Sequence, residues 1–174
     1  MPNHTSNCVD VSVQTGCSKE QLALAELKTM LAINSYEFDF NGIIPMPKEL
    51  NKGRGYGFDN CPSDYKNENG CYVPKSKNVR DKWISNFGFD NWYDWSCMNW
   101  GTKWNSYDVD VDANFDDELT VQFFTAWSCP FPIFAKIKEY CQEHNLNLSW
   151  DVCFEGEDES FDLMDEDMQE WSSS

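Results

Sequence analysis

Regular hydrophobic periodicity occurs at both ends of this chain and is missing from residues 48–107. Residues 8–15 alternate strictly between apolar and polar side chains, which predicts a half-buried strand. A helix is expected from Ser18, where Gln21 completes a capping box, to about Asn34. A second strand is expected over residues 36–44, so that the first part of the chain is predicted to be β-α-β.

The second periodic region predicts two strands, a helix and a last strand. Residues 108–112 alternate like a strand, and residues 119–127 form an apolar one. Pro130 and Pro132 suit the first turn of a helix, and residues 146–154 alternate again. The expected fold class is therefore α+β, a ferredoxin-like split βαβ sandwich with an antiparallel sheet, two helices and one added hairpin strand.

The stretch between the two regions, residues 48–107, is predicted to be a long insertion between the second and third core strands. It holds several glycines and prolines and one helical pattern, over about residues 79–87. It is also rich in aromatic residues, so we expect it to pack into a small core of its own or over the sheet. The domain organisation is then one domain over residues 1–154, with this insertion, followed by an acidic tail over residues 155–174.

The charge is strongly negative and unevenly distributed. The 174 residues include 30 acidic and 13 basic ones, which gives a formal net charge of −17. Residues 1–100 hold 12 acids and 10 bases, whereas residues 101–174 hold 18 acids and 3 bases. With 16% aromatic residues the chain is too apolar to be disordered. Its charge argues against direct binding to nucleic acid or to an anionic membrane, and predicts a basic protein as partner.

No secretory signal or membrane-spanning stretch is recognisable, so we expect a protein of the cytoplasm. The eight cysteines include no C-x-x-C pair and are expected to be reduced. His4, Cys8, Cys141 and His144 have zinc-ligand chemistry, but ordinary core and surface positions explain them better, and we expect neither metal nor cofactor. No spacing of nucleophile and base marks a catalytic site, so no enzyme is expected.

Four short segments carry a resemblance to a known family: residues 1–4 (MPNH), 40–47 (FNGIIPMP), 99–105 (NWGTKWN) and 124–130 (FTAWSCP). In this order they resemble the YubB-like proteins of phages and plasmids, over about residues 1–155. Cys129 stands where a second proline is expected. The resemblance implies a ferredoxin-like domain carried by a mobile element, and it implies no catalytic residues because the family has no settled biochemical function.

The acidic residues of the second half supply the first candidate site. Alternation places Asp108, Asp110 and Asp112 on one face of a strand, about 7 Å apart at two residues of ~3.3 Å each. Neighbouring phosphates of a DNA strand have a similar separation, although a solvated edge protected by charge is the simpler explanation. The residues expected to bind the partner are Asp108, Asp110, Asp112, Asp116, Asp117 and Glu118, and in the tail Glu157, Asp158, Glu159 and Asp162.

A second candidate site is a small-ligand pocket beside the insertion. Trp100, Trp104 and Trp127 offer stacking faces, and Lys103 offers a cationic donor. The competing interpretation is that these tryptophans only anchor the insertion onto the sheet. A pocket of this kind would favour a nucleotide-like ligand.

The charge asymmetry and the resemblance together favour one function. We expect a non-enzymatic bacteriophage or mobile-element protein that inhibits a host defence nuclease, as anti-CRISPR or anti-restriction proteins do. It would occupy the basic nucleic-acid-binding surface of that nuclease as a DNA mimic in the host cytoplasm. The alternative is a small-ligand binding module that uses the aromatic pocket.

Overall fold

The computed structural model of the chain describes residues 3–35, 37–51, 64–66, 69, 72–74, 76–112, 116–154 and 161–164. The strands are β1 (His4–Val13), β2 (Asp64–Lys66), β3 (Tyr72–Pro74), β4 (Tyr107–Asp112), β5 (Glu118–Ala126), β6 (Leu146–Phe154) and β7 (Phe161–Asp162). The helices are α1 (Ser18–Met30), α2 (Lys48–Asn51), α3 (Lys77–Phe87), α4 (Trp92–Asn99) and α5 (Phe131–Glu143), with short 3₁₀ turns η1 (Ile33–Ser35) and η2 (Phe40–Gly42). The fold class is therefore α+β.

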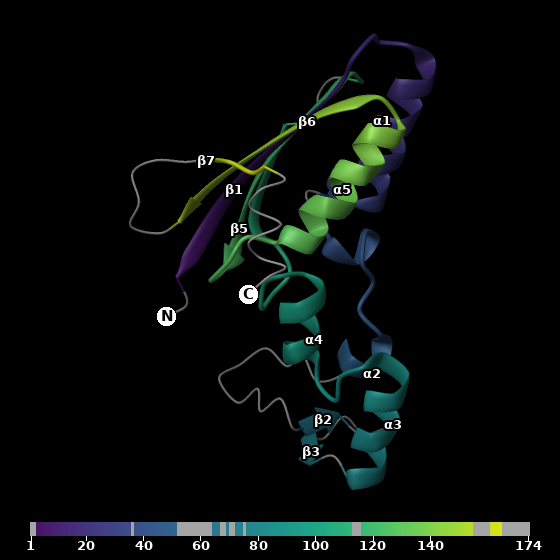
Figure 1. Ribbon diagram of the computed structural model, residues 1–174, viewed down its shortest axis with the longest axis vertical. Helices are drawn as coiled ribbons and strands as arrows, with labels where there is room; N and C mark the ends of the chain where they lie inside the picture. Colours follow the sequence, from purple (N-terminus) through teal and green to yellow (C-terminus); the bar gives the residue numbers. More distant parts are fainter. Residues whose placement is uncertain are drawn as a thin grey trace. The chain divides into compact units, whose positions relative to one another are not determined.

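The chain divides into two compact units, one of residues 1–44 and 100–174 and the other of residues 45–99. The first unit contains a sheet of five strands in the order β4-β5-β1-β6-β7, and every neighbouring pair is antiparallel. α1 and α5 lie side by side on one face of this sheet (Figure 1), where the Tyr140 hydroxyl donates a 3.0 Å hydrogen bond to the Ala23 carbonyl.

An aromatic cluster fills the space between the helices and the sheet. Phe38 stacks on Phe123 of β5 at 4.5 Å between ring centroids, and Trp150 of β6 meets both rings and Phe134 of α5 edge-on. Full burial of such a side chain stabilises the fold by about 1.5–3 kcal/mol. The face of the sheet that carries Trp150 is therefore the core face.

A buried amide ties the central strand to its neighbours. Asn7 of β1 donates to the Thr5 carbonyl and to the Thr125 hydroxyl, both at 3.1 Å. Its Oδ1 accepts a 3.1 Å hydrogen bond from the Trp150 indole. Because these bonds satisfy both ends of the amide, a polar side chain with no exposed surface is tolerated in the core.

Most of the expected elements of the first unit are confirmed. The strand expected at residues 8–15 is β1, which begins earlier, at His4. The strands and helix expected in the second periodic region are β4, β5, α5 and β6, and the bounds expected for β6 are those observed. The helix expected from Ser18 is α1, but Ser18 makes no cap; its third residue, Glu20, accepts hydrogen bonds from the backbone before the helix instead.

The prediction of a strand over residues 36–44 was wrong. In the described part of this segment Phe38 and Phe40 are both buried, which gives the apolar–polar alternation of a strand. The backbone instead turns through η2, because the Asp39 carboxylate accepts a 2.9 Å hydrogen bond from the Asn41 amide. Gly42 passes so close to the Met30 carbonyl that a side chain there would collide with it. The segment therefore closes over the end of α1 and does not join the sheet.

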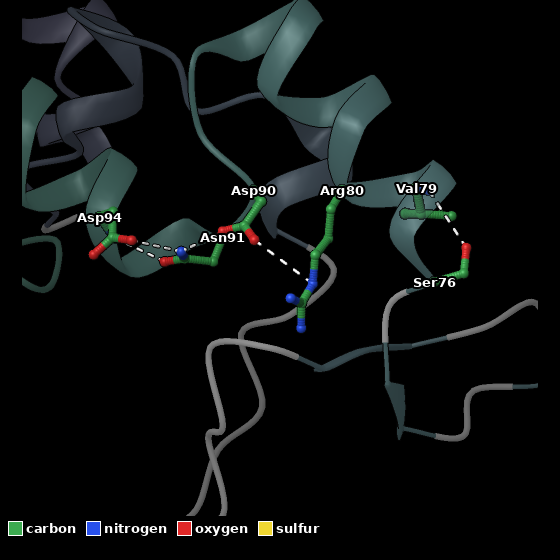
Figure 2. Close-up of polar contacts among 6 residues, drawn as sticks. All are labelled: Ser76, Val79, Arg80, Asp90, Asn91 and Asp94. Atoms are coloured by element: carbon green, nitrogen blue, oxygen red, sulfur yellow. Dashed lines mark hydrogen bonds and ion pairs between the residues drawn. The ribbon is translucent and has the colours of Figure 1, made fainter.

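The second unit contains more regular structure than the expected single helix. That helix is α3, which Ser76 caps by accepting from the Val79 amide (Figure 2). A further helix, α4, begins after Asn91, whose Oδ1 accepts a 2.8 Å hydrogen bond from the Asp94 amide. Arg80 Nε of α3 lies 3.8 Å from a carboxylate oxygen of Asp90, just before α4. Figure 2 shows this ion pair.

Trp83 of α3 and Trp92 and Trp95 of α4 are buried, as the aromatic content of this region led us to expect.

Among the residues that the structure describes, none belongs to a helix that is both long enough and apolar enough to cross a membrane.

Candidate acidic interface on the open sheet face

The sheet of the first unit has one face covered by helices and one that is not part of its core. Val9, Val11 and Trp150 point to the core face, so the residues that alternate with them point to the opposite side. We call this opposite side the open face. Most of its side chains are half-buried or exposed, and most of them are polar.

The strand register brings acidic residues from four strands together on the open face. One cross-strand row consists of Asp110, Gln122, Cys8, Asp151 and Asp162 in the order of the strands. The next row consists of Asp112, Thr120, Asp10 and Ser149. Neighbouring strands are about 4.8 Å apart and alternate residues about 7 Å apart, so the carboxylates form a grid rather than a line.

No positive side chain of the sheet offsets this charge. The five strands contain seven acidic residues and neither lysine nor arginine. Asp10 accepts a hydrogen bond from the Thr120 hydroxyl, which is a neutral donor. The open face therefore presents a negative potential to any approaching group.

Two of the carboxylates interact directly. Asp151 of β6 lies opposite Asp162 of β7, and a hydrogen bond between the two carboxyl groups requires that one of them be protonated. This hydrogen bond, together with burial and the nearby charges of Asp162 and Asp10, raises the pKa of Asp151. Burial and the charges of Asp10 and Asp151 likewise raise the pKa of the Cys8 thiol, so this cysteine is held in its neutral form.

Only some of the residues expected to bind the partner lie on the open face. Asp110, Asp112 and Asp162 lie on it and are exposed, and Glu118 lies at its end, opposite Ser12. Asp108 is exposed but sits in a β-bulge with φ of 49°, so the register does not give it the face of Asp110 and Asp112.

Asp116 and Asp117 are exposed at the turn before β5. There they and Glu118 interact with Lys28 of α1, whose pKa is lowered by burial and raised in part by these three charges. This end of the acidic region is thus partly neutralised from within the chain. Glu157, Asp158 and Glu159 lie outside the described residues.

Sequence reasoning missed Asp10 and Asp151. Neither belongs to a run of acids, so charge clustering does not single them out. Each is nevertheless the polar residue between two buried ones in a strand that the alternation predicts, Asp10 between Val9 and Val11 and Asp151 between Trp150 and Val152. The missing information is the pairing of β1 with β6, which brings both acids to the same part of the open face.

The expected aromatic pocket divides into a core residue and a surface cluster. Trp100 has no exposed surface; its indole donates a 2.8 Å hydrogen bond to the Ile44 carbonyl and meets Phe40 edge-on. Trp127, by contrast, is 45% exposed. The Lys103 ammonium lies 4.8 Å from the ring centroid of Trp104 and 4.7 Å from that of Trp127, between two indoles.

The loop that holds this cluster is fixed by its backbone. Gly101 has φ of +77°, and a Cβ there would lie 2.8 Å from Pro132 Cδ and 3.1 Å from the Cys129 carbonyl. The Thr102 hydroxyl donates a 2.8 Å hydrogen bond to the Ala126 carbonyl, and the Ser128 hydroxyl donates to the Gly101 carbonyl. The glycine and both hydroxyls of this region thus have structural roles that need no ligand.

Three rings lie at the same end of the open face. Tyr107 and Phe124 lie opposite each other on β4 and β5, with centroids 6.2 Å apart and planes 25° apart. His4 meets both edge-on. The Tyr107 hydroxyl lies 2.6 Å from His4 Nδ1 and 3.2 Å from the Thr125 carbonyl oxygen. We call these three residues the aromatic shelf.

His144 and Cys141, which were considered as zinc ligands, have other surroundings in the structure. His144 Nδ1 lies 2.9 Å from the Tyr140 carbonyl, and its ring stacks on Tyr140. Cys141 is buried in the core, which raises its pKa to about 12. Within the described residues, no three or more His, Cys, Asp or Glu side chains come together in a group that could hold a metal ion.

Comparison with known proteins gives no relative: no protein-family model, no curated protein and no solved structure matches the chain.

Proposed function

We propose that this chain is an acidic binding protein that inhibits a host defence nuclease by occupying its basic nucleic-acid-binding surface. The contact is made by the open face, whose carboxylates take the place of phosphates, and no catalytic step is involved. The nuclease belongs to a CRISPR or restriction system, and the protein acts in the host cytoplasm on behalf of a phage or plasmid.

One observation carries the proposal: carboxylates from four strands share a face of a sheet that holds no lysine or arginine. Such a face costs stability through mutual repulsion, whereas protection of the sheet edges would need charge only on the edge strands β4 and β7. Asp10 on the central strand and Asp151 next to it are not edge residues. Their position favours an interface over simple protection of the edge.

The topology supports a ferredoxin-like fold, which we propose together with membership of the YubB-like family. Four neighbouring strands have the order β4-β5-β1-β6, α1 precedes β4 in the chain, and α5 connects β5 to β6. In this assignment the four core strands are β1, β4, β5 and β6. β4 takes the place of the strand expected at residues 36–44, and β7 is an additional strand next to β6. A sheet covered by two helices on one face leaves the other face available to a partner.

The test measures DNA cleavage by purified CRISPR and restriction nucleases in the presence of the protein, at low and at high salt. We expect inhibition of at least one nuclease, with an affinity that falls as salt rises. The double variant Asp110→Asn/Asp112→Asn should bind that nuclease about tenfold more weakly, at about 0.7 kcal/mol for each exposed charge pair lost.

The matched control is Glu139→Gln/Glu143→Gln, which removes the same number of charges from exposed positions on α5, across the sheet from the open face. Its affinity should stay within about twofold of the wild type, since distant surface charges contribute little. Equal losses in the two variants would mean that only the total charge matters and would overturn the assignment of the open face. Failure to inhibit any of the nucleases would overturn the function.

A further inference from the structure

The open face combines aromatic rings with carboxylates at one end. Tyr107 and Phe124 form one cross-strand row, and Asp110 and Gln122 form the next. The β-bulge between Tyr107 and Asp110 makes this possible, because without the extra residue the two would point to opposite faces. The ring of Phe124 and the carboxylate of Asp110 thus belong to adjacent rows, about 7 Å apart along the strand direction.

The same end of the first unit already holds a cation against aromatic rings. Lys103 lies between Trp104 and Trp127, and Trp104 in turn meets Tyr107 edge-on with centroids 6.2 Å apart. The aromatic shelf is therefore connected, through Trp104, to the rings that contact the Lys103 ammonium group. A negative potential around electron-rich ring faces is the environment that favours cation–π contacts.

Resting on the proposed function, we propose that the group recognised at this end of the open face is an arginine side chain of the basic partner. Its guanidinium plane stacks on Phe124 and Tyr107 while its N–H groups donate to Asp110. A guanidinium is planar, weakly hydrated and able to stack and to form paired hydrogen bonds at once. A lysine ammonium is compact and strongly hydrated, so it gains less from the rings.

The experiment compares the binding of two peptides of equal charge, nona-arginine and nona-lysine, to the full chain by isothermal titration calorimetry at physiological salt. We expect the arginine peptide to bind on the order of tenfold more tightly. The variant Phe124→Leu removes the ring and leaves every charge in place, so this preference should fall to about twofold or less. Binding of the lysine peptide should change little.

Two further variants separate the ring from the fold. Phe124→Tyr retains an aromatic face and should retain the preference for arginine. Phe161→Leu is the matched control, because Phe161 of β7 is 37% exposed and stacks on Phe154 away from the shelf. Thermal melts verify folding, and if Phe124→Leu does not fold, Tyr107→Leu replaces it.

The outcomes distinguish this inference from the function on which it rests. An unchanged preference for arginine in the ring variants overturns the inference. If Asp110→Asn/Asp112→Asn still weakens binding of both peptides in that case, the acidic interface stands without the arginine contact. If the double variant binds both peptides as the wild type does, the open face is not the binding surface and the proposed function fails as well.

Discussion

Glu20 shows how one buried carboxylate joins two loops. Its oxygens accept hydrogen bonds from the Thr15 amide at 2.8 Å, the Gly16 amide at 3.1 Å and the Thr15 hydroxyl at 2.9 Å. The Asn145 side chain, from the turn between α5 and β6, donates a fourth hydrogen bond to it. These donors, with the Thr15 amide foremost, lower the pKa of Glu20 to about 2. The carboxylate thus closes the first turn of α1 and fixes the loop that follows β1.

Replacing Glu20 by Gln should lower the melting temperature by several degrees at neutral pH, because an amide nitrogen would face donors. The pKa is near 4.5 in the unfolded chain and about 2 in the folded one, so ionised Glu20 stabilises the protein above pH 4.5. That contribution is lost as the pH falls from about 4.5 to about 2.

Thermal melts over this pH range should show the difference between the wild type and Glu20→Gln narrowing toward low pH. Glu143→Gln, at an exposed position in α5, serves as the control and should show no such trend. A difference that stays constant from pH 7 to pH 2 would contradict the assigned role of the carboxylate.

At the scale of whole elements, sequence periodicity was sufficient for the elements in which apolar and polar residues alternate regularly along the chain. β6 shows this best: Leu146, Trp150 and Val152 are buried, and the residues between them are not. Apolar–polar alternation was misleading at residues 36–44. Phe38 and Phe40 flank Asp39, and this alternation occurs here beside a 3₁₀ turn instead of in a strand. α4 was missed because its buried residues lie among other aromatic ones, which hides their helical spacing.

The candidate site was predictable only where a single element carries it. The alternation at residues 108–112 was sufficient to place Asp110 and Asp112 on the solvent side of a strand. The grid on the open face depends on pairing between β1 and β6, residues that are more than 130 positions apart in the chain. No local pattern encodes that register. The bulge at Asp108 likewise follows from the pairing with β5 and not from the alternation.

The short strand β7 should be held to β6 in a pH-dependent way. Asp162 and Asp151 lie opposite each other, while Leu163 is buried and its amide donates a 2.7 Å hydrogen bond to the Trp150 carbonyl. The pKa of Asp151 is raised in the folded chain, so its protonated form favours the pairing. This contribution is present at low pH and is lost as the pH rises through the folded pKa.

Hydrogen exchange at the Leu163 amide measures this effect, once intrinsic exchange rates have been corrected for. The protection factor should be roughly two- to fivefold higher near pH 4 than at pH 7, since opposed like charges cost about 0.5–1 kcal/mol across strands. In Asp162→Asn the amide can hydrogen-bond to ionised Asp151, and the protection should become independent of pH. A pH dependence that survives in this variant would contradict the carboxyl pair as its cause.

At the scale of the whole molecule, the sheet carries negative charge that nothing within its own strands offsets. The five strands hold seven acids and no base, while the helical side of the first unit includes Lys28, Lys136 and Lys138. Cations are therefore placed on the helices, where they offset charge, and are left out of the sheet. A protein that needed acidity only for solubility would gain from bases interspersed on both sides.

If the open face is retained for binding, neutralising it should stabilise the free protein. We expect Asp110→Asn/Asp112→Asn to raise the melting temperature at low salt by a few degrees, about 0.5–1 kcal/mol in total, because repulsion within the grid is relieved. The gain should shrink at high salt, where screening already weakens that repulsion.

Glu139→Gln is the control: its carboxylate lies 2.7 Å from the Lys136 ammonium, so its loss should bring no gain. Thermal melts of the three proteins at low and high salt decide the matter. A lower melting temperature for the aspartate variant at low salt would mean that these charges stabilise the edge strand, and the argument that they are kept for a partner would lose its basis.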